Sequence, residues 1–246
     1  MNARNGRAHA AAAAIICLAA LAGCAGDPST AASQTADDGI SSGSSVASSA
    51  PSYMTAPITG EKSASSIADH IQQYLDQPRI ITAYEKPILE QARDNGGLTA
   101  KQYEEAWSHF RMCMAGKGYS SVTPTKYPNG VYDHTEMTYA PQSIPNLRFE
   151  DDKIACYQDI SVINQVYSAQ VGNPNFYANR NEAIVDCLHR NELVPKDYTA
   201  QQFQNEELDA MQNETSMLNT HPDINLRDER VRGCFAANMS FYGFTY

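Results

Sequence analysis

Apolar residues recur every three or four positions through most of the sequence after residue 62, which is the spacing of a buried helix face. The first two such stretches run from Ile67 to Leu75 and from about Pro87 to Gly96. Both are followed by helix breakers, a proline in the first case and paired glycines in the second. The pattern therefore predicts a domain built mainly from amphipathic helices.

Capping boxes predict the starts of two further helices. Thr99 precedes Gln102, and Thr199 precedes Gln202, with the spacing of a capping box. The first cap opens an apolar stripe that comprises Tyr103, Ala106, Trp107, Phe110 and Met114. We interpret this stripe as core rather than as a cofactor site, because its spacing is that of a buried helix face.

The remaining pattern predicts three more helices and one hairpin. A single helix is expected from about Arg148 to just before Gly172, another around 184–188, and the last from about Asp228. Residues 119–139 are rich in Thr, Val and Tyr around Asn129-Gly130, a step that supplies the positive backbone angles of a tight hairpin turn. The predicted fold class is mainly α (α+β), a helical domain with one β-hairpin at about 119–139.

The first 23 residues have a different character. Two arginines and no acidic residue precede an apolar run from Ala10 to Leu21, which is short for a membrane span but suits the core of a signal peptide. The run ends in Leu21-Ala22-Gly23-Cys24, which resembles the lipobox of bacterial lipoproteins. The resemblance implies cleavage between Gly23 and Cys24 and a diacylglycerol on the Cys24 thiol. The alternative is an ordinary secretory signal with a cysteine at its cleavage site.

Residues 24–61 would then be the lipidated cysteine and a flexible tether. Ser, Ala, Gly, Thr and Pro dominate this stretch, and no helical or strand period is present. As a flexible coil it would span about 33 Å root-mean-square. Residues 62–246 remain to form the folded part.

The charge of the chain narrows the choice of partners. The formal net charge is −10, and it becomes more negative once Arg4 and Arg7 leave with the signal. An electrostatic nucleic-acid binder is thereby disfavoured, as is a domain that lies flat on an anionic membrane. We expect an extracytoplasmic protein that is held at the bacterial cell membrane by the lipid on Cys24.

Four cysteines belong to the folded part, and they are Cys113, Cys156, Cys187 and Cys234. Outside the cytosol an even number of thiols favours disulfides, and four cysteines allow three pairings. Their nearly equal separations and similar flanking residues suggest two echoing helix-loop-helix halves, 62–172 and 173–246. This echo favours the pairs Cys113–Cys156 and Cys187–Cys234.

Catalytic and metal-binding patterns are weak in this sequence. A mixed Cys/His zinc site can be drawn at His109 and Cys113, but the thiols are explained more simply by disulfides, so no metal and no cofactor is expected. Acidic pairs lie at predicted helix starts, where they favour the helix dipole, so no catalytic residue is assigned. Surface or capping roles are expected for His70, His134 and His221.

Tyrosine is the one compositional bias that suggests binding, since the chain has 14 Tyr and a single Trp. Tyr127, Tyr132 and Tyr139 surround the expected hairpin and form a candidate binding surface, because tyrosine combines a flat apolar face with a polar tip. The alternative interpretation is that these tyrosines fill strand and helix faces.

The lipobox, the Ser/Ala-rich tether and the capped helix that carries Cys113-Met114 together resemble uncharacterised lipoproteins of high-GC Gram-positive bacteria. That resemblance implies no activity. We expect a non-enzymatic, lipid-anchored protein that binds another envelope protein or cell-wall glycan, or has a structural role there. The alternative is a cell-envelope hydrolase that uses acidic residues such as Glu104 or Asp152.

Overall fold

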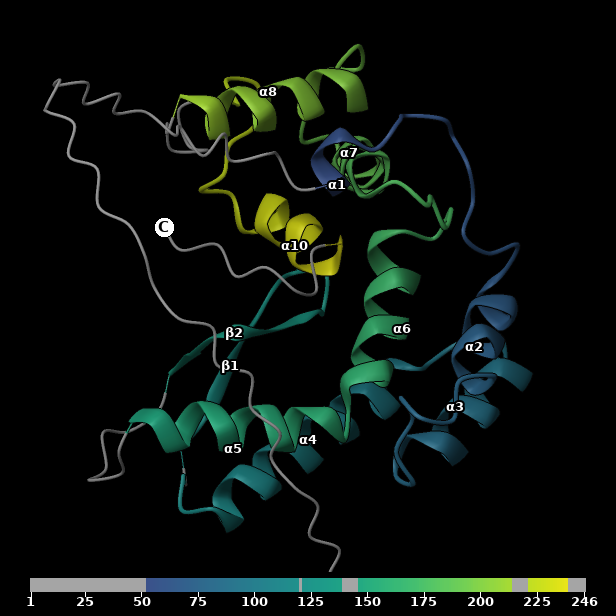
Figure 1. Cartoon of the computed structure of the whole chain (residues 1–246), viewed down its shortest axis with the longest axis vertical. Helices are drawn as coiled ribbons and strands as arrows, with labels where there is room; N and C mark the ends of the chain where they lie inside the picture. Colours follow the sequence, from purple (N-terminus) through teal and green to yellow (C-terminus); the bar gives the residue numbers. More distant parts are fainter. Residues whose placement is uncertain (1–51, 120, 139–145, 214–220, 239–246) are drawn as a thin grey trace, which may run out of the picture. The chain divides into compact units, whose positions relative to one another are not determined.

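The computed structural model describes residues 52–119, 121–138, 146–213 and 221–238, all within the unit Ser48–Tyr246. They form helices joined by one antiparallel hairpin, so the predicted fold class is confirmed (Figure 1). The elements in chain order are α1 (Ser52–Thr55), α2 (Ile67–Leu75), α3 (Glu85–Asp94), α4 (Ala100–Gly116), β1 (Thr123–Lys126), β2 (Tyr132–Thr138), α5 (Asn146–Gln158), α6 (Ser161–Gly172), α7 (Arg180–Arg190), α8 (Ala200–Gln212) and α10 (Glu229–Asn238).

A first hydrophobic cluster is built around α4. Each of the five residues in its predicted stripe is at most 1 % exposed, and the capping box of Thr99 and Gln102 is formed. Apolar residues of α2, α3, α5 and α6 belong to the same cluster. The stripe is therefore core, as its spacing predicts.

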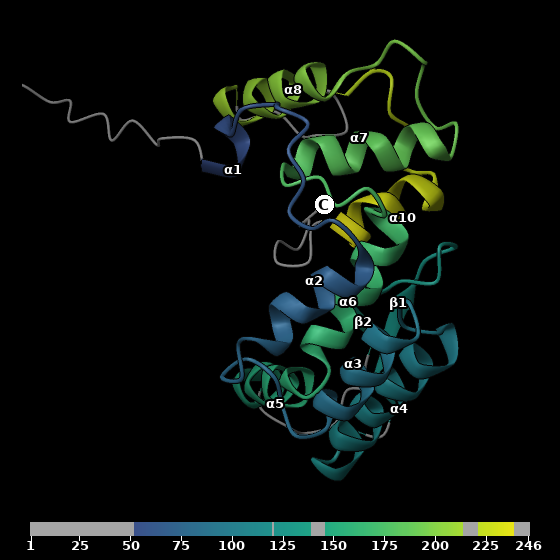
Figure 2. The same cartoon turned by 90° about the vertical axis from the view of Figure 1, so that its right-hand side faces the viewer.

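A second cluster is built from α7, α8 and α10, which lie together in both views (Figure 2). Leu188 of α7, Phe203 of α8 and Phe235 of α10 are among its buried residues. The predicted capping box of Thr199 and Gln202 opens α8.

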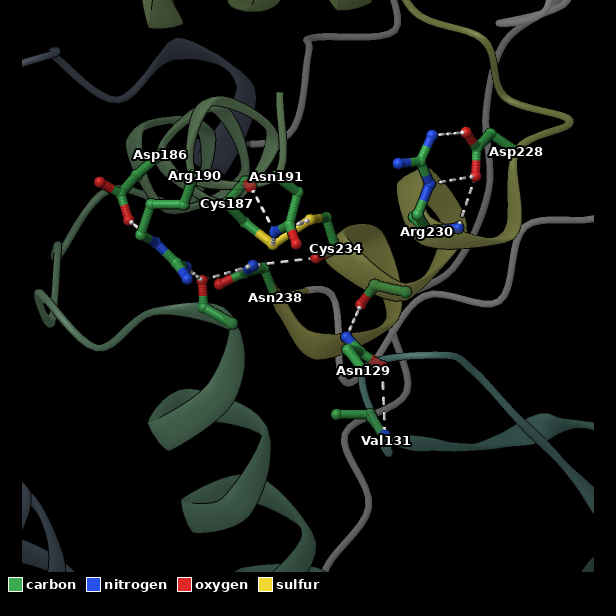
Figure 3. Close-up of a disulfide and its surroundings, with 12 residues drawn as sticks. Asn129, Val131, Asp186, Cys187, Arg190, Asn191, Asp228, Arg230, Cys234 and Asn238 are labelled. Atoms are coloured by element: carbon green, nitrogen blue, oxygen red, sulfur yellow. Dashed lines mark hydrogen bonds and ion pairs between the residues drawn. A yellow bond between two sulfur atoms is a disulfide. The ribbon is translucent and has the colours of Figure 1, made fainter. Parts of the chain in front are cut away.

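Gly172, the last residue of α6, lies where the two clusters meet. A Cβ atom at this position would clash with the side chain of Ala237 in α10, so the close approach of the two helices requires glycine. The Gly172 carbonyl accepts a hydrogen bond from Nη2 of Arg190 in α7 (2.7 Å) and a longer one from Nδ2 of Asn238 (3.4 Å) (Figure 3). One residue thus joins α6, α7 and α10.

Each cluster contains one disulfide. Cys113 of α4 is bonded to Cys156 of α5, and Cys187 of α7 is bonded to Cys234 of α10 (Figure 3). This is the pairing that the sequence echo favours. In the chain-entropy model, each bond stabilises the fold by up to about 4 kcal/mol, because it restricts the unfolded chain.

The two halves are nevertheless built differently. The β-hairpin lies between the first pair of cysteines, whereas α8 lies between the second pair. In the first half the capped helix, α4, itself contains the first cysteine. In the second half the capped helix, α8, follows the helix that contains the first cysteine. The echo therefore extends to the placement of the disulfides and not to the order of the elements.

The folded part begins ten residues before the predicted start at 62. The carbonyl of Ala56 accepts hydrogen bonds from Nδ2 of Asn179 (3.1 Å) and Nε2 of Gln204 (2.8 Å). The amide of Gly60 donates to Oε1 of Glu182 (2.7 Å). The chain from α1 to residue 61 therefore lies against α7 and α8, and the predicted 62–172 half does not stand apart from the second half.

The hairpin turn differs in detail from the expected one. Gly130 has a φ of +85°, but Asn129 does not have a positive φ. The amide of Gly130 donates to the Tyr127 carbonyl (2.8 Å), and the amide of Tyr127 donates to the Val131 carbonyl (2.9 Å). These bonds enclose a three-residue loop with a left-handed glycine at its end. Asn129 instead uses its side chain, whose Nδ2 donates to the carbonyl of Gly233 in α10 (2.7 Å) (Figure 3).

The long helix predicted from Arg148 is two helices, because α5 ends at Gln158 and α6 begins at Ser161. The cause is a carboxylate from another helix. Oε1 of Glu85, at the start of α3, accepts hydrogen bonds from the amides of Val162 (2.7 Å) and Ile163 (3.4 Å). Glu85 thus satisfies the free amides of the first turn of α6.

The second oxygen of the same carboxylate caps α3. Oε2 of Glu85 accepts hydrogen bonds from the amide (3.0 Å) and the hydroxyl (3.1 Å) of Thr82, and the Glu85 amide donates to the Thr82 hydroxyl (3.2 Å). Glu85 is fully buried. Burial raises the pKa of its carboxyl group, and the hydrogen bonds from Thr82, Val162 and Ile163 oppose that rise.

Replacing Glu85 tests this double cap. In Glu85→Gln, an NH₂ group replaces one carboxylate oxygen and faces N–H or O–H donors from which it cannot accept a hydrogen bond. We therefore expect the free energy of unfolding to fall by about 1–3 kcal/mol in urea titrations. Glu90→Gln on the exposed side of α3 is the matched control and should change it by less than about 0.5 kcal/mol. A Glu85→Gln protein as stable as the parent would contradict the assignment.

The two disulfides should also differ in their sensitivity to reductant. Cys113 is half-buried, whereas the three other bonded cysteines are at most 2 % exposed. Since thiol attack requires access to a sulfur atom, mild reduction should open Cys113–Cys156 first. Alkylation followed by peptide mass spectrometry measures this order, and earlier labelling of Cys187 or Cys234 would refute it.

Candidate functional site

Tyr127 and Tyr132, two of the three tyrosines of the candidate binding surface, are packed within the protein. Tyr127 is buried, and the ring of Tyr132 packs 5.0 Å from that of Trp107 while its hydroxyl donates to Oε2 of Glu104 (2.7 Å). Tyr139 lies outside the described residues. Tyr127 and Tyr132 therefore follow the alternative interpretation, in which tyrosines fill the faces of the elements.

The acidic residues proposed for hydrolysis lie in ion pairs. Glu104 pairs with Lys126, and although burial opposes the effect, this ammonium and the Tyr132 hydroxyl lower the pKa of Glu104. Asp152 accepts from Nζ of Lys117 (2.8 Å), which lowers its pKa as well. A general acid needs a raised pKa, so neither Glu104 nor Asp152 suits that role.

The residues considered for zinc are also engaged elsewhere. The Cys113 thiolate is consumed by its disulfide, and His109 stacks on Tyr84 and lies 3.4 Å from Asp159. Among the described residues, no three His, Cys, Asp or Glu side chains gather at one point. In the same part of the chain, no helix combines the length and the apolar character needed to cross a bilayer.

A cavity of about 840 Å³ opens between the segment that leads into α2 and the segment that leaves α6. One wall consists of Lys62–Ile67 and Asp69, and the other consists of Gln170 and Pro174–Phe176. Its volume falls in the range of pockets that hold small ligands. No signal in the sequence marks it, because its walls lie about a hundred residues apart in the chain.

Backbone hydrogen bonds join the two walls of this cavity. The amide and the hydroxyl of Ser63 donate to the Phe176 carbonyl (2.8 and 3.1 Å), and the amide of Ala178 donates to the Glu61 carbonyl (2.8 Å). Lys62 pairs with Tyr177 between these bonds, and its Nζ lies 3.3 Å from the centre of the Tyr177 ring. The ammonium group of Lys62 is thus held by a cation–π contact.

The wall that contains Lys62 ends in the capped start of α2. Ser66 is the N-cap, and its hydroxyl accepts from the Asp69 amide (3.1 Å). Oδ2 of Asp69 accepts hydrogen bonds from the amide (2.8 Å) and the hydroxyl (3.1 Å) of Ser65, and these bonds lower the pKa of Asp69. The wall therefore presents hydroxyls beside a carboxylate that already has partners.

Phe176 is the unusual residue of the cavity wall. Its φ of +51° lies in the left-handed region, which is strained for a residue with a bulky side chain. Its ring lies 5.3 Å from the ring of His70, whose two nitrogens are both inaccessible and without a hydrogen-bond partner. Burial lowers the pKa of His70, so the neutral imidazole is favoured.

His221 was expected at the surface or as a cap, but it is buried in the second cluster. Its Nδ1 lies 2.6 Å from Oε2 of Glu206, and the Tyr198 hydroxyl donates to the same oxygen (2.5 Å). Phe203 stacks on the imidazole with ring centroids 4.9 Å apart. Burial lowers the pKa of His221, although Glu206 acts in the opposite direction. His134 has no described side chain.

Comparison of the chain with protein-family models, with curated proteins and with solved structures finds no match. Its function must be argued from its own residues.

The buried histidine should make stability depend on pH. A histidine whose folded pKa is lowered binds its proton mainly in the unfolded chain, so its stabilising effect is complete above about pH 6.5 and is lost as the pH falls. We expect the free energy of unfolding to decrease from pH 7 to pH 5, by at most about 1.4 kcal/mol per pH unit for one histidine.

The measurement is a series of urea titrations across this pH range. His221→Gln should have a shallower pH dependence than the parent. An unchanged slope in His221→Gln would assign the pH dependence to other groups.

Proposed function

We propose that this protein is a lipid-anchored, extracytoplasmic lipoprotein whose helical domain has a non-enzymatic binding or structural role in the cell envelope. The observation that carries the proposal is the pair of disulfides, Cys113–Cys156 and Cys187–Cys234. Such bonds persist in oxidising compartments and are rare in the cytosol. The lipobox resemblance rests on different residues, Leu21–Cys24, and agrees with that compartment.

The disulfides support export because they involve every cysteine of the folded part. Two of the three pairings that four cysteines allow would have linked the halves, yet each bond joins two helices inside one hydrophobic cluster. Burial of Cys187 and Cys234 places the second bond in the core itself. Such an arrangement stabilises a small domain that must remain folded where reducing systems and chaperones of the cytosol are absent.

A binding role is supported by the kind of surface that the cavity offers. Its walls supply serine hydroxyls and apolar side chains, while Lys62 and Asp69 already have partners within the protein. Glu104 and Asp152, the acidic residues named as examples for the hydrolase alternative, lie in ion pairs that lower their pKa values. The arrangement favours recognition of a ligand over its chemical conversion.

The anchor is tested at Cys24. In a bacterial host that processes lipoproteins, the parent protein should incorporate labelled palmitate and sediment with membranes, because two or three acyl chains anchor far more firmly than one. Cys24→Ala should lose both properties. Cys17→Ala, inside the apolar run, is the matched control and should keep them. Palmitate incorporation into Cys24→Ala would overturn the proposal.

A further inference from the structure

We propose that the cavity between Lys62–Asp69 and Gln170–Phe176 binds an uncharged, N-acetylated glycan, with His70 as a hydrogen-bond partner that the ligand reaches when the Phe176 ring turns away. This inference rests on the proposed function, since it names the ligand class that a binding protein of the cell envelope would meet there.

The charges of the cavity favour an uncharged ligand. Lys62 and Asp69 are of opposite sign, so their formal charges cancel. Nζ of Lys62 lies over the Tyr177 ring, and the Asp69 carboxylate accepts two hydrogen bonds from Ser65. A phosphate or a carboxylate entering the cavity would have to draw Lys62 from this contact and would face the charge of Asp69.

The hydrogen-bonding groups match a ligand rich in hydroxyls. Ser63, Ser65 and Ser66 each use their hydroxyl in the contacts described above, and a hydroxyl has one donor and two acceptor sites, so each retains capacity. In the first turn of α2, the amides of Ile67 and Ala68 also lack intrahelical acceptors. Ala64, Ile67 and Pro174 line the cavity between these groups and suit the apolar faces and acetyl methyl groups of such a glycan.

His70 supplies the observation that points to a missing partner. Both of its ring nitrogens are inaccessible and unpaired, a state that native proteins rarely retain without a reason. The ring is in contact with Tyr74 on one side and with Phe176 on the other, at centroid distances of 5.2 and 5.3 Å. Phe176 also lines the cavity, so its ring is what the ligand must displace to reach the imidazole.

The backbone of Phe176 does not have to move for this displacement. A phenylalanine at a φ of +51° is strained, and the bonds of its carbonyl to the amide and hydroxyl of Ser63 hold it there. The ring can turn about its side-chain bonds while the paired backbone stays in place. A glycan hydroxyl can then donate to one nitrogen of His70 or accept from the other, because the neutral imidazole has one donor and one acceptor.

The test is calorimetric titration of the full chain, purified in detergent, with chitotetraose as the probe. Binding of the parent is expected, together with a shift in the NMR signals of the His70 ring. His70→Phe keeps a ring between Tyr74 and Phe176 but removes both nitrogens, so it should be at least as stable as the parent and bind at least tenfold more weakly. His109→Phe is the matched control and should bind as the parent does.

A second variant guards against a folding defect in the first. Ser65→Trp fills the cavity from an exposed position and should abolish binding of chitotetraose. The proposal is overturned if the parent does not bind millimolar chitotetraose, if both variants bind as the parent does, or if inorganic phosphate binds in its place. Any of these results alongside normal palmitate labelling at Cys24 would remove the glycan site and leave the proposed function standing.

Discussion

The buried carboxylate of Glu85 is the contact on which the arrangement of the first cluster depends. It caps its own helix through Thr82 and the start of α6 through Val162 and Ile163. A buried charge is costly unless it is fully hydrogen-bonded, so these donors have to stay in place. The position of α6 follows from this contact, and α6 in turn packs against α2, α3, α4 and α10.

The other end of α6 contacts helices of the second cluster. Its last residue, Gly172, allows the close approach of α10 and accepts the hydrogen bond from Arg190 of α7. The hairpin reaches α10 independently through Asn129, and the segment from Ala56 to Gly60 joins α7 and α8. The disulfides lie within the clusters, whereas the hydrogen bonds of Gly172 and Asn129 link elements of the two clusters, so the two kinds of contact stabilise different parts of the fold.

Features that depend on neighbouring residues could be predicted from the sequence. The capping boxes at Thr99 and Thr199 and the buried stripe of α4 are local patterns, and the spacing and flanking residues of the cysteines favour the observed disulfide pairing over the two others. The break before α6 could not be predicted in this way. Thr82 and Glu85 have the spacing of a capping box. The amides of Val162 and Ile163, which donate to the same carboxylate, lie 77 and 78 residues further along the chain.

The candidate site is non-local for the same reason. Phenylalanine has no propensity for positive φ, so nothing around Phe176 in the sequence announces its conformation. That conformation is imposed by pairing with Ser63, 113 residues away, and the same pairing brings the ring onto His70. The strained residue, the unpaired imidazole and the cavity therefore have a common origin in one backbone contact. A replacement that weakened this contact would relax Phe176, uncover His70 and open the cavity together, which couples the stability of this segment to the occupancy of the site.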